Sequence, residues 1–230
     1  MAKILNIDTS SSICSVAVAI DGEIQMGLES YKKMDHSTSL APFVKDCLDL
    51  MKKRGEKLDA VSVTLGPGSY TGLRIGLSMA KGLAFGLDIP LITLSSLKVM
   101  AVRAIFSDKD FQGDEKIVPM IDARRMEVFT GVYDSRLALS ENEGPKILNE
   151  ETFRDLGNER RVIFIGDGVS KFQPLYQHKN AVWFPEGMPH AKYMAMLSEI
   201  CFRDKNFSDV AYTVPSYLKE YQTTIQKKLI

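Results

Sequence analysis

A stripe of small residues inside one predicted helix is the feature of this sequence that most restricts its fold. Gly72, Gly76, Ala80 and Ala84 recur every four positions, so they lie on one face of a helix predicted over residues 70–87. Each glycine inside a helix costs about 1 kcal/mol relative to alanine, and close approach of another backbone is the usual compensation. That neighbour is either the chain's own sheet or a second protein chain, and both remain open at this point.

The turn before this helix, residues 66–69, also has features of a phosphate-binding loop, because it is rich in glycine and leads into a helix N-terminus. A P-loop would continue with Gly-Lys-Ser or Gly-Lys-Thr. Here the sequence continues Tyr-Thr-Gly-Leu-Arg, so this nucleotide-binding motif is excluded.

The rest of the first half alternates short apolar strands with amphipathic helices, which is typical of an α/β fold. Asp21-Gly22 has the composition of a tight hairpin turn between two of these strands. We predict strands over residues 3–8, 13–20, 23–28, 59–65 and 91–94, and helices over 37–54, 70–87 and 95–104.

Residues 107–115 are polar, and they mark a boundary after which a second pattern of strands and helices begins. We predict two lobes, residues 1–106 and 107–230, with the last twenty or so residues packing back on the first lobe. In the second lobe we expect strands over 116–121, 127–133 and 162–165, a turn at 166–168 and a helix over 191–202.

Composition limits the classes of function. Lysine and arginine number 29, aspartate and glutamate also number 29, and the net charge is zero, so the chain is not expected to grip a phosphate backbone by itself. Cys14, Cys47 and Cys201 are spaced too widely for a zinc or disulfide motif. The N-terminus has no apolar signal segment, and charges interrupt the apolar stretch 73–94, which predicts a cytoplasmic protein without a membrane span.

Several segments, taken in chain order, resemble one known family. The most specific is Gly-Pro-Gly-Ser-Tyr-Thr-Gly-Leu-Arg-Ile-Gly at 66–76, and the other matching segments are 7–10, 15–17, 36–37, 121–124, 166–168 and 214–219. On these residues the sequence resembles the TsaB (YeaZ) family of bacterial tRNA threonylcarbamoyladenosine (t6A) biosynthesis proteins, within the TsaD or peptidase M22 (glycoprotease-like) superfamily.

This resemblance implies a two-lobed α/β fold of the actin, Hsp70 and sugar-kinase type. It also implies a non-catalytic subunit that binds a TsaD-type catalytic subunit and works with a TsaE-type ATPase to transfer threonylcarbamoyl to adenosine 37 of tRNA. The first two helices would form the surface for the partner, or for a homodimer when the chain is alone, and tRNA would be met only indirectly. The residues expected at this surface are Tyr70, Gly72, Leu73, Gly76, Leu77 and Ala80.

In this fold class, nucleotide is bound by an Asp-x-Gly-Ser/Thr turn in each lobe. The corresponding turns here keep an aspartate but lack the glycine that lets backbone amides approach phosphate. We therefore predict a degenerate nucleotide cleft and no cofactor bound by the chain on its own. The aspartates could also serve only to cap their turns, and a nucleotide contact shared with the partner stays open. The residues of this cleft would be Asp8, Thr9, Ser10, Asp122, Gly166 and Gly168.

Catalytic relatives hold a metal through two histidines one helical turn apart. Here His36 is followed four positions later by Leu40, so neither a metal site nor a catalytic residue is expected. Two alternatives from other classes stay open: a stand-alone phosphotransferase of the same fold and an M22-like metallopeptidase.

A pair of arginines follows the second aspartate. Arg124 and Arg125, next to Asp122, could bind an anion or the partner. A solvated turn is the commoner explanation for such charges, and the sequence does not choose between these roles.

Overall fold

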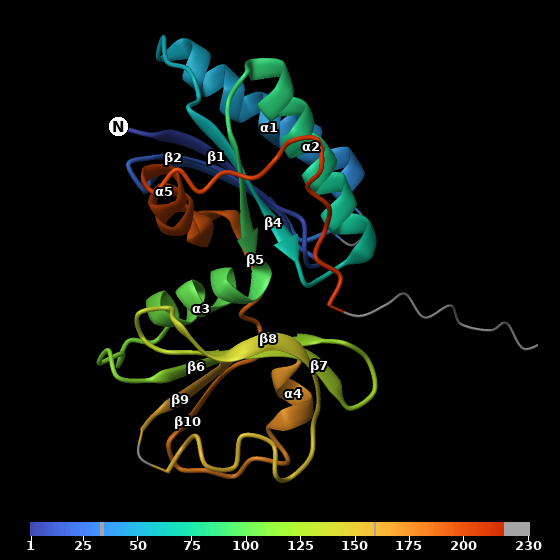
Figure 1. Cartoon of the computed structure of the whole chain (residues 1–230), viewed down its shortest axis with the longest axis vertical. Helices are drawn as coiled ribbons and strands as arrows, with labels where there is room; N and C mark the ends of the chain where they lie inside the picture. The colour runs from blue at the N-terminus through green and yellow to red at the C-terminus, as the bar shows by residue number, and fades with distance from the viewer. Residues whose placement is uncertain (33–34, 159, 219–230) are drawn as a thin grey trace, which may run out of the picture.

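The computed structural model describes residues 1–32, 35–158 and 160–218. Two five-stranded sheets lie one above the other along the long axis of the molecule, and helix α3 (Ser96–Ser107) lies between them (Figure 1). The two-lobed α/β architecture predicted from the sequence is therefore confirmed.

The first sheet has the strand order β3-β2-β1-β4-β5, with β1 antiparallel to β2 and parallel to β4. Asp21 and Gly22, both with positive φ, form the turn that pairs β2 with β3. The strands are β1 (Lys3–Asp8), β2 (Cys14–Ile20), β3 (Glu23–Ser30), β4 (Ala60–Gly66) and β5 (Leu91–Ser95).

Helices cover both faces of this sheet. On one face lie α1 (His36–Lys53) and α2 (Tyr70–Leu87), and on the other lie α3, η1 (Ala191–Met194) and α5 (Ala195–Arg203). Because successive side chains of a strand point to opposite faces, Leu5 and Ile7 join the first core while Ile4 joins the second. None of the helices in the described ranges is long and apolar enough to cross a membrane.

The second sheet has the order β10-β9-β6-β7-β8. Helix α3 covers one of its faces, and α4 (Val169–Phe172) covers the other. Helix α3 therefore belongs to two cores, because Val99 and Val102 pack against the first sheet while Met100 and Ala104 pack against the second. The strands are β6 (Lys116–Asp122), β7 (Glu127–Tyr133), β8 (Leu139–Ile147), β9 (Val162–Ile165) and β10 (Ala181–Phe184).

The sequence did not predict three elements of the second lobe, β8, α4 and β10. Strand β8 is a largely exposed edge strand with a run of polar residues, so it lacks the apolar alternation that marks a strand, and the other two elements have only four residues each. The helix predicted over 191–202 is divided into η1 and α5, and both pack on the first sheet. The chain thus returns to the first lobe at residue 191, earlier than expected.

Residues 208–217 form a C-terminal strap that runs along β5 and α2 (Figure 1). The strap is held at both ends, because Ser208 N donates to Leu91 O and Ser216 N donates to Leu65 O, each at 2.8 Å. Between these points the Lys81 ammonium group donates to the carbonyl oxygens of residues 211 and 213 at 3.0 and 3.1 Å. Residues 219–230, which also belong to the segment expected to pack on the first lobe, lie outside the described residues.

Candidate functional site

The glycine face of α2 packs against the loop that follows β1. A Cβ atom on Gly72 would lie 2.0 Å from the Thr9 carbonyl oxygen, and one on Gly76 would lie 2.2 Å from the Thr9 hydroxyl oxygen. The Thr9 hydroxyl donates a hydrogen bond of 2.7 Å to the Gly72 carbonyl oxygen. The sequence left open whether the small-residue face of α2 packs on the chain itself or on a second chain. The structure shows that it packs on Thr9 of the same chain.

This packing corrects the choice of partner-contact residues. Five of the six residues predicted at the surface face inward, and Tyr70 alone of the six is exposed, at 39%. The reason is that the small residues allow α2 to lie against the sheet, and this contact buries them. The inward residues are Gly72, Leu73, Gly76, Leu77 and Ala80.

The outward side of α2 forms a shallow groove with α1. A cavity of about 620 Å³ is lined by Ser37 of α1 together with Arg74, Ile75, Ser78, Met79, Gly82 and Leu83 of α2. A second cavity of about 590 Å³ shares Ser37 and Ile75 with the first and continues to the N-terminal ends of both helices. Ile75, Met79 and Leu83 are only half-buried, so the structure leaves an apolar row open along this groove.

Asp8, at the end of β1, is fully buried. Its Oδ1 accepts hydrogen bonds from the Ser10 hydroxyl at 2.7 Å and from the Thr64 hydroxyl at 2.6 Å. Its Oδ2 has no hydrogen-bond partner among the described residues. Burial raises the pKa of Asp8 in spite of the hydrogen bonds from Thr64 and Ser10. Because Oδ1 is held by Ser10 and Thr64 and both oxygens are buried, Asp8 presents no exposed oxygen to hydrated magnesium.

The loop after Asp8 is also used for internal contacts. Ser69 N donates to the Ser10 carbonyl oxygen at 2.7 Å, and that same oxygen lies 2.2 Å from the position of a Cβ on Gly68. Thr9 meets α2 as described above. The backbone that would have to approach a phosphate group is thus covered by the turn and helix that follow β4.

In the second lobe, Asp122 is exposed at the end of β6. Its carboxylate accepts hydrogen bonds from Lys171 Nζ and from the backbone N–H of Arg124, while its own N–H donates to Asp167 Oδ1 at 2.8 Å. Burial raises the pKa of Asp167. Asp122 thus organises the turn after β6, which agrees with the capping role that the sequence left open.

The two glycines of the 166–168 turn have packing roles. A Cβ on Gly166, whose φ is +115°, would lie 2.3 Å from the Met120 carbonyl oxygen. A Cβ on Gly168 would lie 2.7 Å from Val128 Cγ1. Both glycines let the turn approach β6 and β7 closely, so neither is left facing open space where a phosphate group could bind.

His36 begins α1 and is almost fully buried. Its Nε2 lies 2.9 Å from the Ser11 carbonyl oxygen, and Leu40, one turn later, is buried in the core. Over the described ranges, no three His, Cys, Asp or Glu side chains come together in a way that could hold a metal ion. The geometry therefore makes His36 a residue that fixes the start of the helix.

A contact between His190 and Glu29 was not predicted from the sequence. The His190 Nε2 meets the Glu29 carboxylate, and Ala191 N donates to the Ser15 hydroxyl at 2.9 Å. Burial lowers the pKa of His190. This contact holds the start of η1 on β2 and β3. Its two partners are 161 positions apart, so no local pattern could have revealed it.

Comparison with known proteins identifies the family. Residues 31–228 match the family described as TsaD: tRNA N6-adenosine threonylcarbamoyltransferase. The tRNA threonylcarbamoyladenosine biosynthesis protein TsaB of Bacillus subtilis is 32% identical over 223 residues, which cover 94% of this chain and 93% of that protein. The chain belongs to the TsaB family. The resemblance inferred from the sequence motifs is thus confirmed, and the process in which this family acts is t6A modification of tRNA.

Solved structures agree with this TsaB assignment and extend it to the fold. YeaZ from Pseudomonas aeruginosa superposes with a TM-score of 0.81 at 27% identity, covering 95% of this chain and all of that one. An inorganic polyphosphate/ATP-glucomannokinase from an Arthrobacter species superposes with a TM-score of 0.51 at 9% identity, covering 88% of this chain and all of that one. The second likeness concerns the fold alone, and it confirms the sugar-kinase type of architecture.

Proposed function

We propose that this chain is a non-catalytic subunit that binds a TsaD-type catalytic subunit through the groove between α1 and α2. The observation that carries this proposal is the half-buried apolar row of Ile75, Met79 and Leu83, which packs against the edge of the first core and lines the groove beside Ser37 of α1. Apolar side chains one helical turn apart are suited to packing against a helix of a partner. When the catalytic subunit is missing, the same groove would pair two copies of this chain.

The complex would transfer threonylcarbamoyl to adenosine 37 of tRNA in the cytoplasm, with a TsaE-type ATPase as a further subunit. The names of the relatives support the process. The state of the cleft supports a non-catalytic role, because Asp8 is buried and Thr9 and Ser10 are engaged with α2 and the turn before it. Nucleotide and magnesium would be held by the partner subunits, or shared with them.

The proposed interface can be tested by introducing a charged side chain into the groove between α1 and α2. Met79→Glu should prevent assembly with the catalytic subunit in gel filtration and abolish t6A formation on unmodified tRNA in a reconstituted reaction, because a buried unpaired carboxylate is costly. Ile200→Glu is a matched control, since Ile200 is 49% exposed on α5, on the other face of the sheet. Circular dichroism verifies that both variants are folded. Undiminished assembly of the Met79 variant would refute the proposed interface.

A further inference from the structure

The turn between β6 and β7 contains two adjacent residues in an unusual backbone conformation. Arg124 has φ +72° and Arg125 has φ +49°, so both lie in the left-handed region. The turn is closed by Ala123 N donating to Glu127 O and Glu127 N donating to Arg124 O, each at 3.1 Å. Turns with consecutive positive φ angles normally use Asn, Asp or Gly, because other side chains are strained there. Two arginines at this place therefore call for a compensating role.

The side chains of these arginines make no contact within the described part of the chain that would offset the strain of their backbone conformation. Both residues are exposed, and across the described residues neither guanidinium group has a hydrogen bond or an ion pair. Arg161 behaves differently, because its guanidinium group is bound to Asp108 and Glu115. Backbone strain at residues whose own side chains make no stabilising contact is often found at functional positions.

The neighbouring acidic group leaves both arginines available. The Asp122 carboxylate accepts the Arg124 N–H and the Lys171 ammonium group, so it holds the backbone of the turn and is itself neutralised by Lys171. The turn thus presents two positive charges to the solvent. It projects on the side of the molecule that also carries α2 (Figure 1, lime green below the helix).

We propose that the Arg124–Arg125 turn binds phosphate groups of the tRNA backbone while the α1–α2 groove is occupied by the catalytic subunit. The choice of RNA rests on the proposed function in t6A synthesis. Guanidinium groups match phosphate oxygens in a bidentate geometry. A chain of zero net charge needs a local cationic site to meet RNA at all. This proposal departs from the expectation that tRNA is met only indirectly.

The experiment uses the assembled complex of this chain with its catalytic subunit and fluorescently labelled unmodified tRNA. The variant Arg124→Asn/Arg125→Gly should weaken tRNA binding at least tenfold, and the slope of log affinity against log salt should become shallower by about one to two. Because the new residues suit the turn, the melting temperature of the isolated chain should rise. Arg124→Lys/Arg125→Lys keeps the charges and should retain most of the salt slope.

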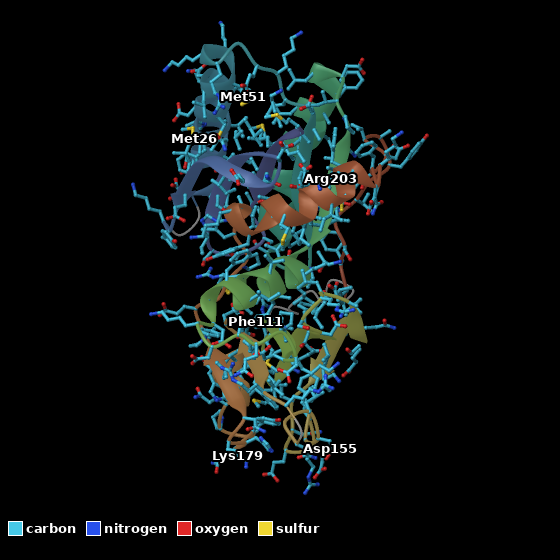
Figure 2. The ribbon with its side chains drawn as sticks, turned by 90° about the vertical axis from the view of Figure 1, so that its left-hand side faces the viewer. Met26, Met51, Phe111, Asp155, Lys179 and Arg203 are labelled. Atoms are coloured by element: carbon cyan, nitrogen blue, oxygen red, sulfur yellow. The ribbon has the colours of Figure 1, made fainter. Side chains whose placement is uncertain are left out.

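A matched control removes two cations elsewhere. Lys205 is exposed with φ +54°, so Lys205→Gly relieves backbone strain in the same way. Lys179→Asn removes an exposed charge at the far end of the second lobe (Figure 2). The double variant should leave tRNA affinity unchanged. An equal loss in this control, or unchanged affinity in the arginine variant, would overturn the proposal.

Assembly is measured separately by gel filtration, so that the two proposals can fail independently. If the arginine variant lost assembly with the catalytic subunit while the tRNA affinity of the remaining complex was unchanged, the turn would contact the protein partner and the RNA proposal would be wrong. If the unaltered chain failed to assemble at all, the proposed function would be wrong instead.

Discussion

Each lobe has a turn that follows a central strand ending in aspartate. The turn of the first lobe is buried, whereas the turn of the second lobe is exposed to solvent. In the first lobe, Asp8 is buried and Thr9 is pressed against α2. In the second lobe, Asp122 is exposed and the following Arg124 and Arg125 extend into solvent. The difference follows from what lies against each turn, because the 18-residue helix α2 covers the first, whereas the four-residue helix α4 reaches the second through Lys171, which binds Asp122. The same topology can therefore produce a turn packed against a helix in one lobe and a solvent-accessible turn in the other.

The largest effect that would test this comparison is expected at the contact between Gly76 of α2 and Thr9. Gly76→Ala should lower the free energy of unfolding by about 2 kcal/mol, because its Cβ would meet the Thr9 hydroxyl oxygen at 2.2 Å. Gly82→Ala on the same helix has no atom within 4 Å of its Cβ and should raise the free energy of unfolding by up to about 1 kcal/mol. Urea denaturation of both variants measures the difference. Equal effects at the two positions would mean that the close contact with Thr9 does not exist.

The same contact changes the expected outcome of a larger substitution. An arginine at position 76 would test assembly if the glycine stripe faced a partner. Because Gly76 faces Thr9, Gly76→Arg should instead destabilise the chain itself.

A second prediction concerns the buried acid of the first lobe. Burial raises the pKa of Asp8 above the value it has in the unfolded chain, so the folded state binds the proton more tightly. Asp8 therefore makes folding less favourable as the pH rises above the unfolded-state pKa. Asp8→Asn removes this dependence. The melting temperature of the variant minus that of the unaltered protein should therefore be larger at pH 7 than at pH 5.

The opposite sign would mean that Asp8 is stabilised as an anion, as expected if it served a cation. Calorimetric titration of the chain alone with Mg-ATP is the companion measurement. We expect no heat of binding for either protein. Binding that disappears in the Asp8 variant would restore the nucleotide cleft and favour the phosphotransferase alternative.

The smallest effect is expected where the C-terminal strap meets α2. The rings of Tyr70 and Tyr217 lie 5.0 Å apart between centroids, and Arg74 Nε donates to the Tyr217 hydroxyl at 2.9 Å. Tyr217→Ala should lower the free energy of unfolding by about 1 kcal/mol, while Tyr212→Ala, at an 83% exposed strap position, should leave it unchanged. Equal values for the two variants in thermal denaturation would show that the strap is not held by this contact.

Most of the first lobe could be predicted from local patterns. The helix over residues 70–87 and the strand over 3–8 begin and end where they were predicted, because the periodicity of apolar side chains and the turn residues around them are local signals. Strand β8 was missed because it is an exposed edge without apolar alternation. The sequence predicted the cleft residues from their place in the motif, whereas their burial and hydrogen bonds could be assigned only from the structure.

The sequence by itself determined the elements of the first lobe, the small-residue stripe and the family, since all three depend on residue types at fixed spacings. Only the tertiary structure decided which neighbour the stripe meets, and it is Thr9 rather than a partner. It also decided that the chain returns to the first sheet at residue 191 and that His190 meets Glu29. The physical reason is that periodicity defines which face of a helix is apolar or small, whereas the surface that this face covers is set by contacts between residues far apart in the chain.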